Sequence, residues 1–113
     1  MNDNAQNATP MNILVVDDDS TIRKTLSYCL AAEGYTVIAV SNPDDAIEEA
    51  KRRSFDIAFV DLKLGEANGM DLIPLLVSDS SWTKIVVITA HASIETAVEA
   101  MRRGATDYIA KPF

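Results

Sequence analysis

Cysteine is almost absent from this sequence: Cys29 is the single one among 113 residues. One cysteine cannot form an intramolecular disulfide, so the chain differs from the disulfide-stabilised secreted proteins, and a reducing cytoplasm is its expected location. Cys29 lies at helical spacing from Ile22, Leu26 and Leu30. This spacing predicts that Cys29 is an inert residue of the hydrophobic core.

Long apolar runs and an excess of positive charge are also missing. No segment approaches the roughly 20 apolar residues of a membrane-spanning helix, and residues 1–12 contain neither the basic nor the apolar region of a signal peptide. Ten Lys and Arg residues stand against 17 Asp and Glu, which gives a net charge of −7. Such a surface disfavours nonspecific binding to nucleic acid or to an anionic membrane. We therefore expect a domain that contacts neither directly.

Four short apolar runs are present instead, and each one ends in a polar residue. Runs of this kind are typical of parallel strands that are buried on both faces of a sheet. In an open parallel sheet, ligands bind outside the carboxyl ends of the strands. The combined set of acids, a hydroxyl and an ammonium suits a divalent cation and a phosphoryl group. The runs are Ile13–Val16 before Asp17, Asp18 and Asp19; Ile57–Val60 before Asp61; Ile85–Ile88 before Thr89; and Tyr108–Ala110 before Lys111.

Helical patterns alternate with the strands, which predicts a doubly wound α/β sheet in a single domain. We expect strands over 13–16, 35–40, 57–60, 85–88 and 107–110, and helices over 20–33, 43–53, 70–77 and 93–103. Residues 1–11 are predicted to be a flexible tail, residues 62–69 a mobile loop, and residues 12–113 the folded domain. The closing helix expected after the last strand lies outside the sequence. Two interpretations remain open: the sequence is an excerpt of a longer protein, or one sheet face stays partly uncovered, which would favour dimerisation or aggregation.

The strand ends resemble the receiver domains of bacterial two-component response regulators. The resemblance spans Asn12 to Phe113 and implies a flavodoxin-like strand order, 2-1-3-4-5, in a regulatory domain rather than an enzyme. Residues Gly104 to Tyr108 are most similar to receivers of the nitrogen-regulator class, in which an ATPase module and a DNA-binding module follow. The matching segments are Ile13 to Asp19, Val60-Asp61-Leu62, Ile88-Thr89-Ala90 and Lys111-Pro112-Phe113.

The resemblance implies that Asp61 accepts a phosphoryl group from a histidine kinase in a Mg²⁺-dependent reaction. Asp18 and Asp61 would bind the ion directly, Asp17 through water, and Lys63 through its backbone carbonyl. This agrees with the physical chemistry, because clustered carboxylates repel one another and Mg²⁺ prefers oxygen ligands. For Asp19 two interpretations remain open, a cap of the following helix or a neighbour of the metal site.

The resemblance further implies that Lys111 and Thr89 bind the phosphoryl oxygens and that Thr89 and Tyr108 act as the switch, with transcription as the controlled output. The Lys111–Pro112 bond is expected to be cis, as in the family. Lys63 and His91 each lie two residues beyond a site residue and are expected to tune the lifetime of the phosphoryl group. The expected signalling surface is helix 93–103 with strand 107–110, a candidate homodimer interface that includes Ile94, Met101, Arg102 and Asp107.

Three other functions fit parts of the pattern. A phosphatase of the haloacid-dehalogenase type would use Asp17 as nucleophile and Asp19 as acid/base, but it needs a further acidic pair after the lysine. A receiver-like binding module that never takes phosphate would be expected to lack one of the acid, hydroxyl and lysine groups. An FMN-binding flavodoxin-like protein would need a Ser/Thr-rich loop after the first strand.

Overall fold

Five parallel strands form the centre of the computed structural model, which describes residues 10–112 and all of their side chains except that of Asp79. The strand order is β2-β1-β3-β6-β7, as expected from the resemblance. The predictions for residues 1–9 and for Phe113 lie outside the described residues. The strands are β1 (Asn12–Val16), β2 (Thr36–Val40), β3 (Ile57–Asp61), β6 (Lys84–Thr89) and β7 (Asp107–Ala110).

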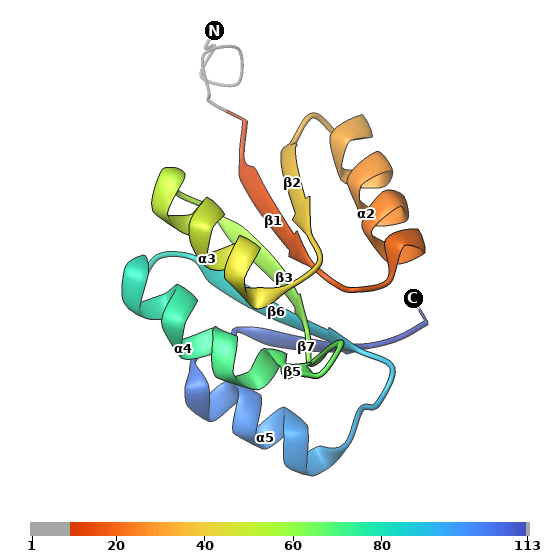
Figure 1. Ribbon diagram of the computed structural model, residues 1–113, viewed down its shortest axis with the longest axis vertical. Coiled ribbons are helices and arrows are strands. Elements are labelled where there is room, and N and C mark those ends of the chain that lie inside the picture. Colours follow the sequence, from red (N-terminus) through yellow and green to blue (C-terminus); the bar gives the residue numbers. More distant parts are fainter. Residues whose placement is uncertain (1–9, 113) are drawn as a thin grey trace, which may run out of the picture.

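Four helices connect the strands, and their boundaries lie within two residues of the predicted ones. Three of them cover one face of the sheet, and α2 lies over the other (Figure 1). No helix of the described part of the chain is long and apolar enough to cross a membrane. The helices are α2 (Ser20–Ala32), α3 (Pro43–Arg52), α4 (Gly69–Asp79) and α5 (Ile94–Arg103).

Polar side chains start the helices, as expected of capping residues. The Asn42 side chain accepts a hydrogen bond from the backbone N–H of Asp45, with Pro43 next in the chain. The Asp19 side chain accepts from the N–H of Thr21 at 2.9 Å. Of the two interpretations left open for Asp19, the structure therefore supports the helix cap.

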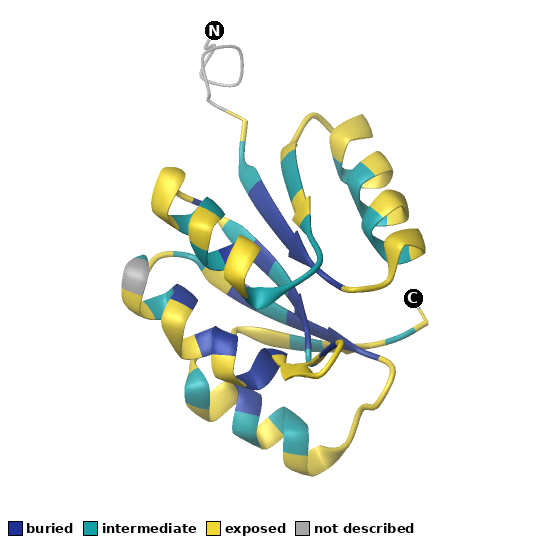
Figure 2. Cartoon of the chain, in the orientation of Figure 1, coloured by how far each residue is buried: buried dark blue, intermediate teal, exposed yellow. Residues whose placement is uncertain are grey.

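The hydrophobic core lies between the sheet and helices α3, α4 and α5. Strand β1 is buried on both faces, because Ile13 to Val16 are at most 1% exposed. Figure 2 shows the same contrast between buried central strands and exposed outer helix faces. This burial fixes the ends of β1 and β3 in place and so positions the polar residues that follow. The helix side chains buried in this core are Ala46, Met70, Leu72, Ile73, Leu76 and Ala100.

The prediction that Cys29 belongs to the core is wrong, because its thiol is free and exposed. Helix α2 contains no buried residue (Figure 2). Its half-buried face is centred on Leu26 and Leu30, and at about 100° per residue Cys29 lies about a quarter turn from that centre. The apolar spacing indicates the half-buried stripe of α2 but not which edge of that stripe faces solvent.

Two local features of the segment between β3 and β6 differ from the prediction. The predicted loop over 62–69 contains a short antiparallel hairpin of β4 (Lys63–Leu64) and β5 (Ala67–Asn68). In the predicted helix 70–77, Pro74 would fall near the first turn, where proline is tolerated, but α4 begins at Gly69 and Pro74 lies inside it. The hairpin belongs to the surroundings of Asp61, because β4 begins at Lys63, two residues later.

Candidate functional site

Three carboxylates meet at the carboxyl ends of β1 and β3. These strands are neighbours, with Val16 opposite Val60, so Asp17 and Asp61 lie at the same edge of the sheet. Asp17, Asp18 and Asp61 each offer an oxygen within 4.8 Å of the others. Asp17 is completely buried, whereas Asp18 is exposed. The sequence prediction that these acids converge is thus borne out by their positions.

Lys111, just after β7, reaches across the sheet edge to two of these acids. Its Nζ lies 2.8 Å from Oδ2 of Asp17 and 3.0 Å from Oδ2 of Asp61. Burial alone would lower the pKa of this ammonium, but its contacts with the two carboxylates outweigh burial and raise the pKa above its ordinary value. Lys111 therefore remains charged at neutral pH. The Lys111–Pro112 peptide bond is cis, as expected.

Burial raises the pKa of the Asp17 carboxyl, and the contact with Lys111 and a hydrogen bond from the Asp19 N–H offset this only in part. Oδ2 of Asp17 is buried, and the charged group that faces it is the Lys111 ammonium at 2.8 Å. A buried carboxylate oxygen with unused acceptor capacity, beside two further carboxylates, fits a divalent cation.

Backbone N–H groups hold the three carboxylates in place. Asp17 Oδ1 accepts from the N–H of Asp19 at 2.9 Å, and Asp61 Oδ1 accepts from the N–H of Lys63 at 3.2 Å. Asp18 Oδ2 accepts from the N–H of Gly65 at 2.8 Å. This last bond joins the β4–β5 hairpin to the acidic cluster, a contact that the sequence alone did not predict.

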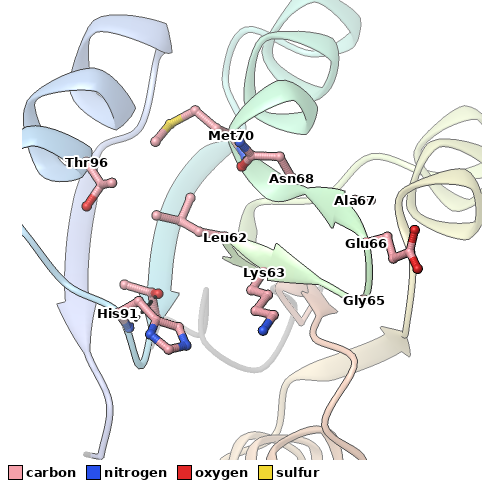
Figure 3. A pocket seen from close by; sticks show the side chains of 10 residues that line it. Leu62, Lys63, Gly65, Glu66, Ala67, Asn68, Met70, His91 and Thr96 are labelled. Carbon is pink, nitrogen blue, oxygen red and sulfur yellow. Dashed lines mark hydrogen bonds between the residues drawn. The ribbon is translucent and has the colours of Figure 1, made fainter.

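A cavity of about 370 Å³ adjoins the cluster, between the hairpin and the segment that follows β6 (Figure 3). Lys63 and His91 both line it. Thr89 is fully buried at the end of β6, and its Oγ1 accepts a hydrogen bond from the N–H of His91 at 3.0 Å. Thr96 borders the same cavity from α5.

Tyr108 contacts the first turn of α5 through its hydroxyl group. The hydroxyl lies 2.6 Å from Oγ1 of Thr96 and accepts from the N–H of Ser93 at 3.3 Å. Tyr108 was expected at the switch, whereas no expectation was attached to Thr96. The i, i+3 pair Ser93 and Thr96 is a signal for a helix cap and does not reveal that a tyrosine from β7 lies beside it.

Gly69 is a second position that the sequence analysis did not assign to the site. A Cβ atom at this position would overlap the carbonyl oxygen of Asp61. The N–H of Gly69 donates to the carbonyl of Leu62 at 2.7 Å. Only glycine allows α4 to begin this close to the Asp61 backbone, and a glycine at the end of a loop gives no sequence signal of such an approach.

Helix α5 presents an apolar stripe to solvent. Ile94 is 82% exposed, Val98 53% and Met101 42%. Arg102 and Asp107 are exposed as well, so the predicted signalling surface is accessible. Large apolar side chains gathered on one exposed face are typical of an interaction surface.

Comparison with known proteins agrees with this geometry. The family description of the response regulator receiver domain matches residues 13–113. The alginate biosynthesis transcriptional regulatory protein AlgB of Pseudomonas aeruginosa is 45% identical over 100 residues, which are 88% of this chain and 22% of AlgB. The regulatory protein AtoC of Escherichia coli is 35% identical over 101 residues, 89% of this chain and 22% of AtoC. The chain thus spans about a fifth of these relatives.

Solved structures show the same similarity. A response regulator from Burkholderia pseudomallei with a phosphorylated aspartic acid, a calcium ion and citrate superimposes with a TM-score of 0.89 at 40% identity, over 91% of this chain and 61% of that one. The beryllofluoride-activated NtrC4 receiver domain dimer gives a TM-score of 0.85 at 32% identity, over 90% and 84%. The nitrogen-regulator resemblance is confirmed, and the phosphatase and flavodoxin interpretations are set aside. The chain belongs to the response regulator receiver domain family.

Proposed function

We propose that residues 12–113 form a cytoplasmic phosphorylation-activated switch in which Asp61 is the phosphoacceptor. The observation that carries this proposal is the position of the Lys111 ammonium, 3.0 Å from Oδ2 of an Asp61 side chain that lies next to two further acids. The donor is a histidine kinase, the partner of response regulators. Since AlgB and AtoC are regulatory proteins, the first a transcriptional one by name, the output we propose is transcription.

In the proposed reaction, a carboxylate oxygen of Asp61 attacks the phosphorus of the phosphohistidine. A new O–P bond forms, the N–P bond breaks, and the electron pair returns to the histidine nitrogen. Lys111 attracts one phosphoryl oxygen, and the Thr89 hydroxyl donates a hydrogen bond to another. Thr89 Oγ1 accepts a hydrogen bond from the N–H of His91, so its own hydroxyl proton remains available for this bond.

Asp18 and Asp61 would bind Mg²⁺ directly, Asp17 through a water molecule and Lys63 through its backbone carbonyl. When bound, the ion neutralises negative charge on the phosphoryl oxygens. The unused acceptor capacity of Asp17 and the proximity of three carboxylates support this set. The N–H of Gly65, now bonded to Asp18, lies at the same cluster, so ion binding and the hairpin position depend on one another.

Thr89 and Tyr108 are the proposed switch residues. When Thr89 moves towards the phosphoryl group, it leaves space beside the cavity that Thr96 also lines. Tyr108 already contacts Thr96, so a change at the cavity reaches the first turn of α5. The surface of α5 and β7 would then control an output module or form a homodimer. Lys63 and His91 border this cavity and would set the lifetime of the phosphoryl group by controlling water access.

Intact mass spectrometry after incubation with acetyl phosphate and Mg²⁺ tests the proposal. We expect the parent chain to gain one phosphoryl group, and Asp61→Asn or omission of the metal to abolish the gain. Asp44→Asn, which alters an exposed acid in the first turn of α3, is the matched control and should be phosphorylated normally. Unchanged phosphorylation of Asp61→Asn, or no phosphorylation of the folded parent chain, would contradict the proposal.

A further inference from the structure

Pro74 interrupts the backbone hydrogen bonds of α4. In an α-helix, the N–H of each residue donates to the carbonyl four residues earlier, and proline has no N–H. Because Pro74 lies inside α4, the carbonyl of Met70 loses the donor that any other residue at position 74 would supply. Met70 is buried in the first turn of this helix, directly after the hairpin beside Asp61.

Arg103, in the last turn of α5, supplies a replacement donor. Its guanidinium NH1 lies 3.3 Å from the Met70 carbonyl oxygen and 2.8 Å from Oδ1 of Asp71. Its Nε donates to Oε2 of Glu99 at 2.7 Å, which fixes the guanidinium plane along α5. Three acceptors on two helices therefore share one side chain, and Figure 1 shows these two helices side by side.

The neighbouring base provides a natural contrast. Arg102 has a 76% exposed side chain, and its contact with Glu99 is a loose one at 3.8 Å. The hydrogen bonds to Glu99 and Asp71 raise the pKa of Arg103, and the bond from Arg103 lowers the pKa of Glu99, so both stay charged over the whole physiological range. Arg103 thus differs from Arg102 in its contacts, because Arg103 connects α5 with α4.

Helix α5 is held unequally at its two ends. Near its last turn, Ala100 is fully buried and Gly104 packs against Val77 of α4, where a Cβ on the glycine would lie 3.1 Å from the valine. At its first turn, Ile94 is 82% exposed and the contacts are hydroxyl bonds to Tyr108 beside the cavity. Helix α5 is therefore packed against α4 at its last turn and is held at its first turn mainly by polar contacts with Tyr108.

A continuous series of contacts connects Arg103 to Asp61. The guanidinium holds Met70, whose N–H donates to the Asn68 side chain at 2.9 Å. Gly69, between these two residues, lies against the Asp61 carbonyl and donates to Leu62. A change in the Asp61 backbone therefore reaches the first turn of α4, and from there the last turn of α5, through packed or hydrogen-bonded groups.

We propose that Arg103 is a positioning residue that completes α4 at the carbonyl left free by Pro74 and fixes the last turn of α5 as the pivot of the switch. The role of Arg103 as a pivot rests on the proposed function, because a pivot requires that phosphorylation moves α5. The hydrogen bond from Arg103 to the Met70 carbonyl, which Pro74 leaves without a helical donor, is present without phosphorylation and is tested separately.

The first test is a double-mutant cycle by urea unfolding of the unphosphorylated chain. Arg103→Met, which keeps the apolar stem of the side chain, is expected to raise the equilibrium constant for unfolding about tenfold. Arg102→Met is expected to raise it less than about twofold. Pro74→Ala returns an N–H to the Met70 carbonyl, so in that background the effect of Arg103→Met should fall by at least half. An equal effect of Arg103→Met in the parent and in Pro74→Ala would show that Arg103 does not replace the donor missing at Pro74.

The second test is amide hydrogen exchange with and without acetyl phosphate and Mg²⁺. We expect phosphorylation to change exchange in residues 94–98 and to leave residues 100–104 protected, in the parent chain and in Arg102→Met. In Arg103→Met the change should extend to residues 100–104. The same exchange pattern in Arg102→Met and Arg103→Met would refute the role of Arg103 as a pivot. A lack of phosphorylation by intact mass would refute the proposed function and leave the result of the double-mutant cycle unaffected.

Discussion

The ammonium group of Lys111 lies closer to Asp17, at 2.8 Å, than to Asp61, at 3.0 Å. The residue proposed to accept the phosphoryl group therefore shares its cation with a fully buried neighbour. If the Lys111 ammonium moves towards a phosphoryl group on Asp61, the negative charge of Asp17 loses its nearest cation. A buried carboxylate without a charged partner costs free energy. This explains why a divalent cation and a lysine would be needed together at this site.

The buried Asp17 carboxyl is expected to reduce stability at neutral pH in the absence of metal. Its pKa is raised in the folded state, so its favourable contribution is fully present below the ordinary value of 3.8 and is lost as the pH rises through the raised value. Asp17→Asn should therefore increase the free energy of unfolding at pH 7 by on the order of 1 kcal/mol, with little change at low pH. Urea unfolding with a chelator present measures this. A less stable variant at pH 7 would mean that the Lys111 contact outweighs burial.

Divalent cations should stabilise the chain through the acidic cluster. Binding to the folded state alone raises stability by mass action, about 2.7 kcal/mol at 100 times the dissociation constant. Asp18→Asn should lose most of the Mg²⁺-dependent rise in Tm, because it removes an exposed carboxylate of the cluster without creating a buried unpaired group. Calorimetry with a Mg²⁺ titration is the measurement. An equal rise in Asp18→Asn and the parent would contradict the proposed ligand set.

Gly69→Ala is expected to destabilise the fold by about 3 kcal/mol, because the added methyl group must displace the backbone of Asp61 or α4. Gly65→Ala, in the hairpin that precedes α4, is the matched control. Gly65 has a φ of +64° but open space around its Cβ position, so about 1 kcal/mol is expected there. Urea unfolding of both variants decides the matter, and equal costs would show that close approach to Asp61 is unimportant.

The hydrogen bond between Tyr108 and Thr96 should contribute about 1 kcal/mol to stability. Tyr108→Phe, Thr96→Val and the double variant form a cycle in which the two single effects should not add. We expect the same variants to weaken the response of α5 to phosphorylation, measured by hydrogen exchange. Additive effects in the cycle would argue against a direct contact between the two hydroxyls.

The strands and the strand-end residues were predictable because each signal is local. An apolar run followed by an acid, a hydroxyl or a lysine reports both the strand and the edge at which it ends. The parallel arrangement then brings these ends together, as seen for Asp17 and Asp61. Asn42 followed by Pro43 is a local signal of the same kind, because a capping amide before a proline marks the start of α3.

What could not be predicted depends on contacts between distant segments. Arg103 appeared as one of two bases at a helix end, and no local feature distinguishes it from Arg102. Its role depends on Pro74, 29 positions earlier, and on the packing of α4 against α5. Cys29 was misplaced for a similar reason, since helical spacing defines a stripe but not its centre.

Asp17, Asp61 and Lys111 meet at the sheet edge but come from distant parts of the described chain. Lys111 lies 50 residues beyond Asp61. While the chain emerges from the ribosome, Asp17 and Asp61 are therefore synthesised well before the cation that compensates them. The nascent domain must carry both acids uncompensated or leave β1 and β3 unpaired until β7 adds to the sheet edge. Long-range pairing of this kind slows folding. The proposed phosphoacceptor site is thus complete only when β7, which positions Lys111, has joined the sheet.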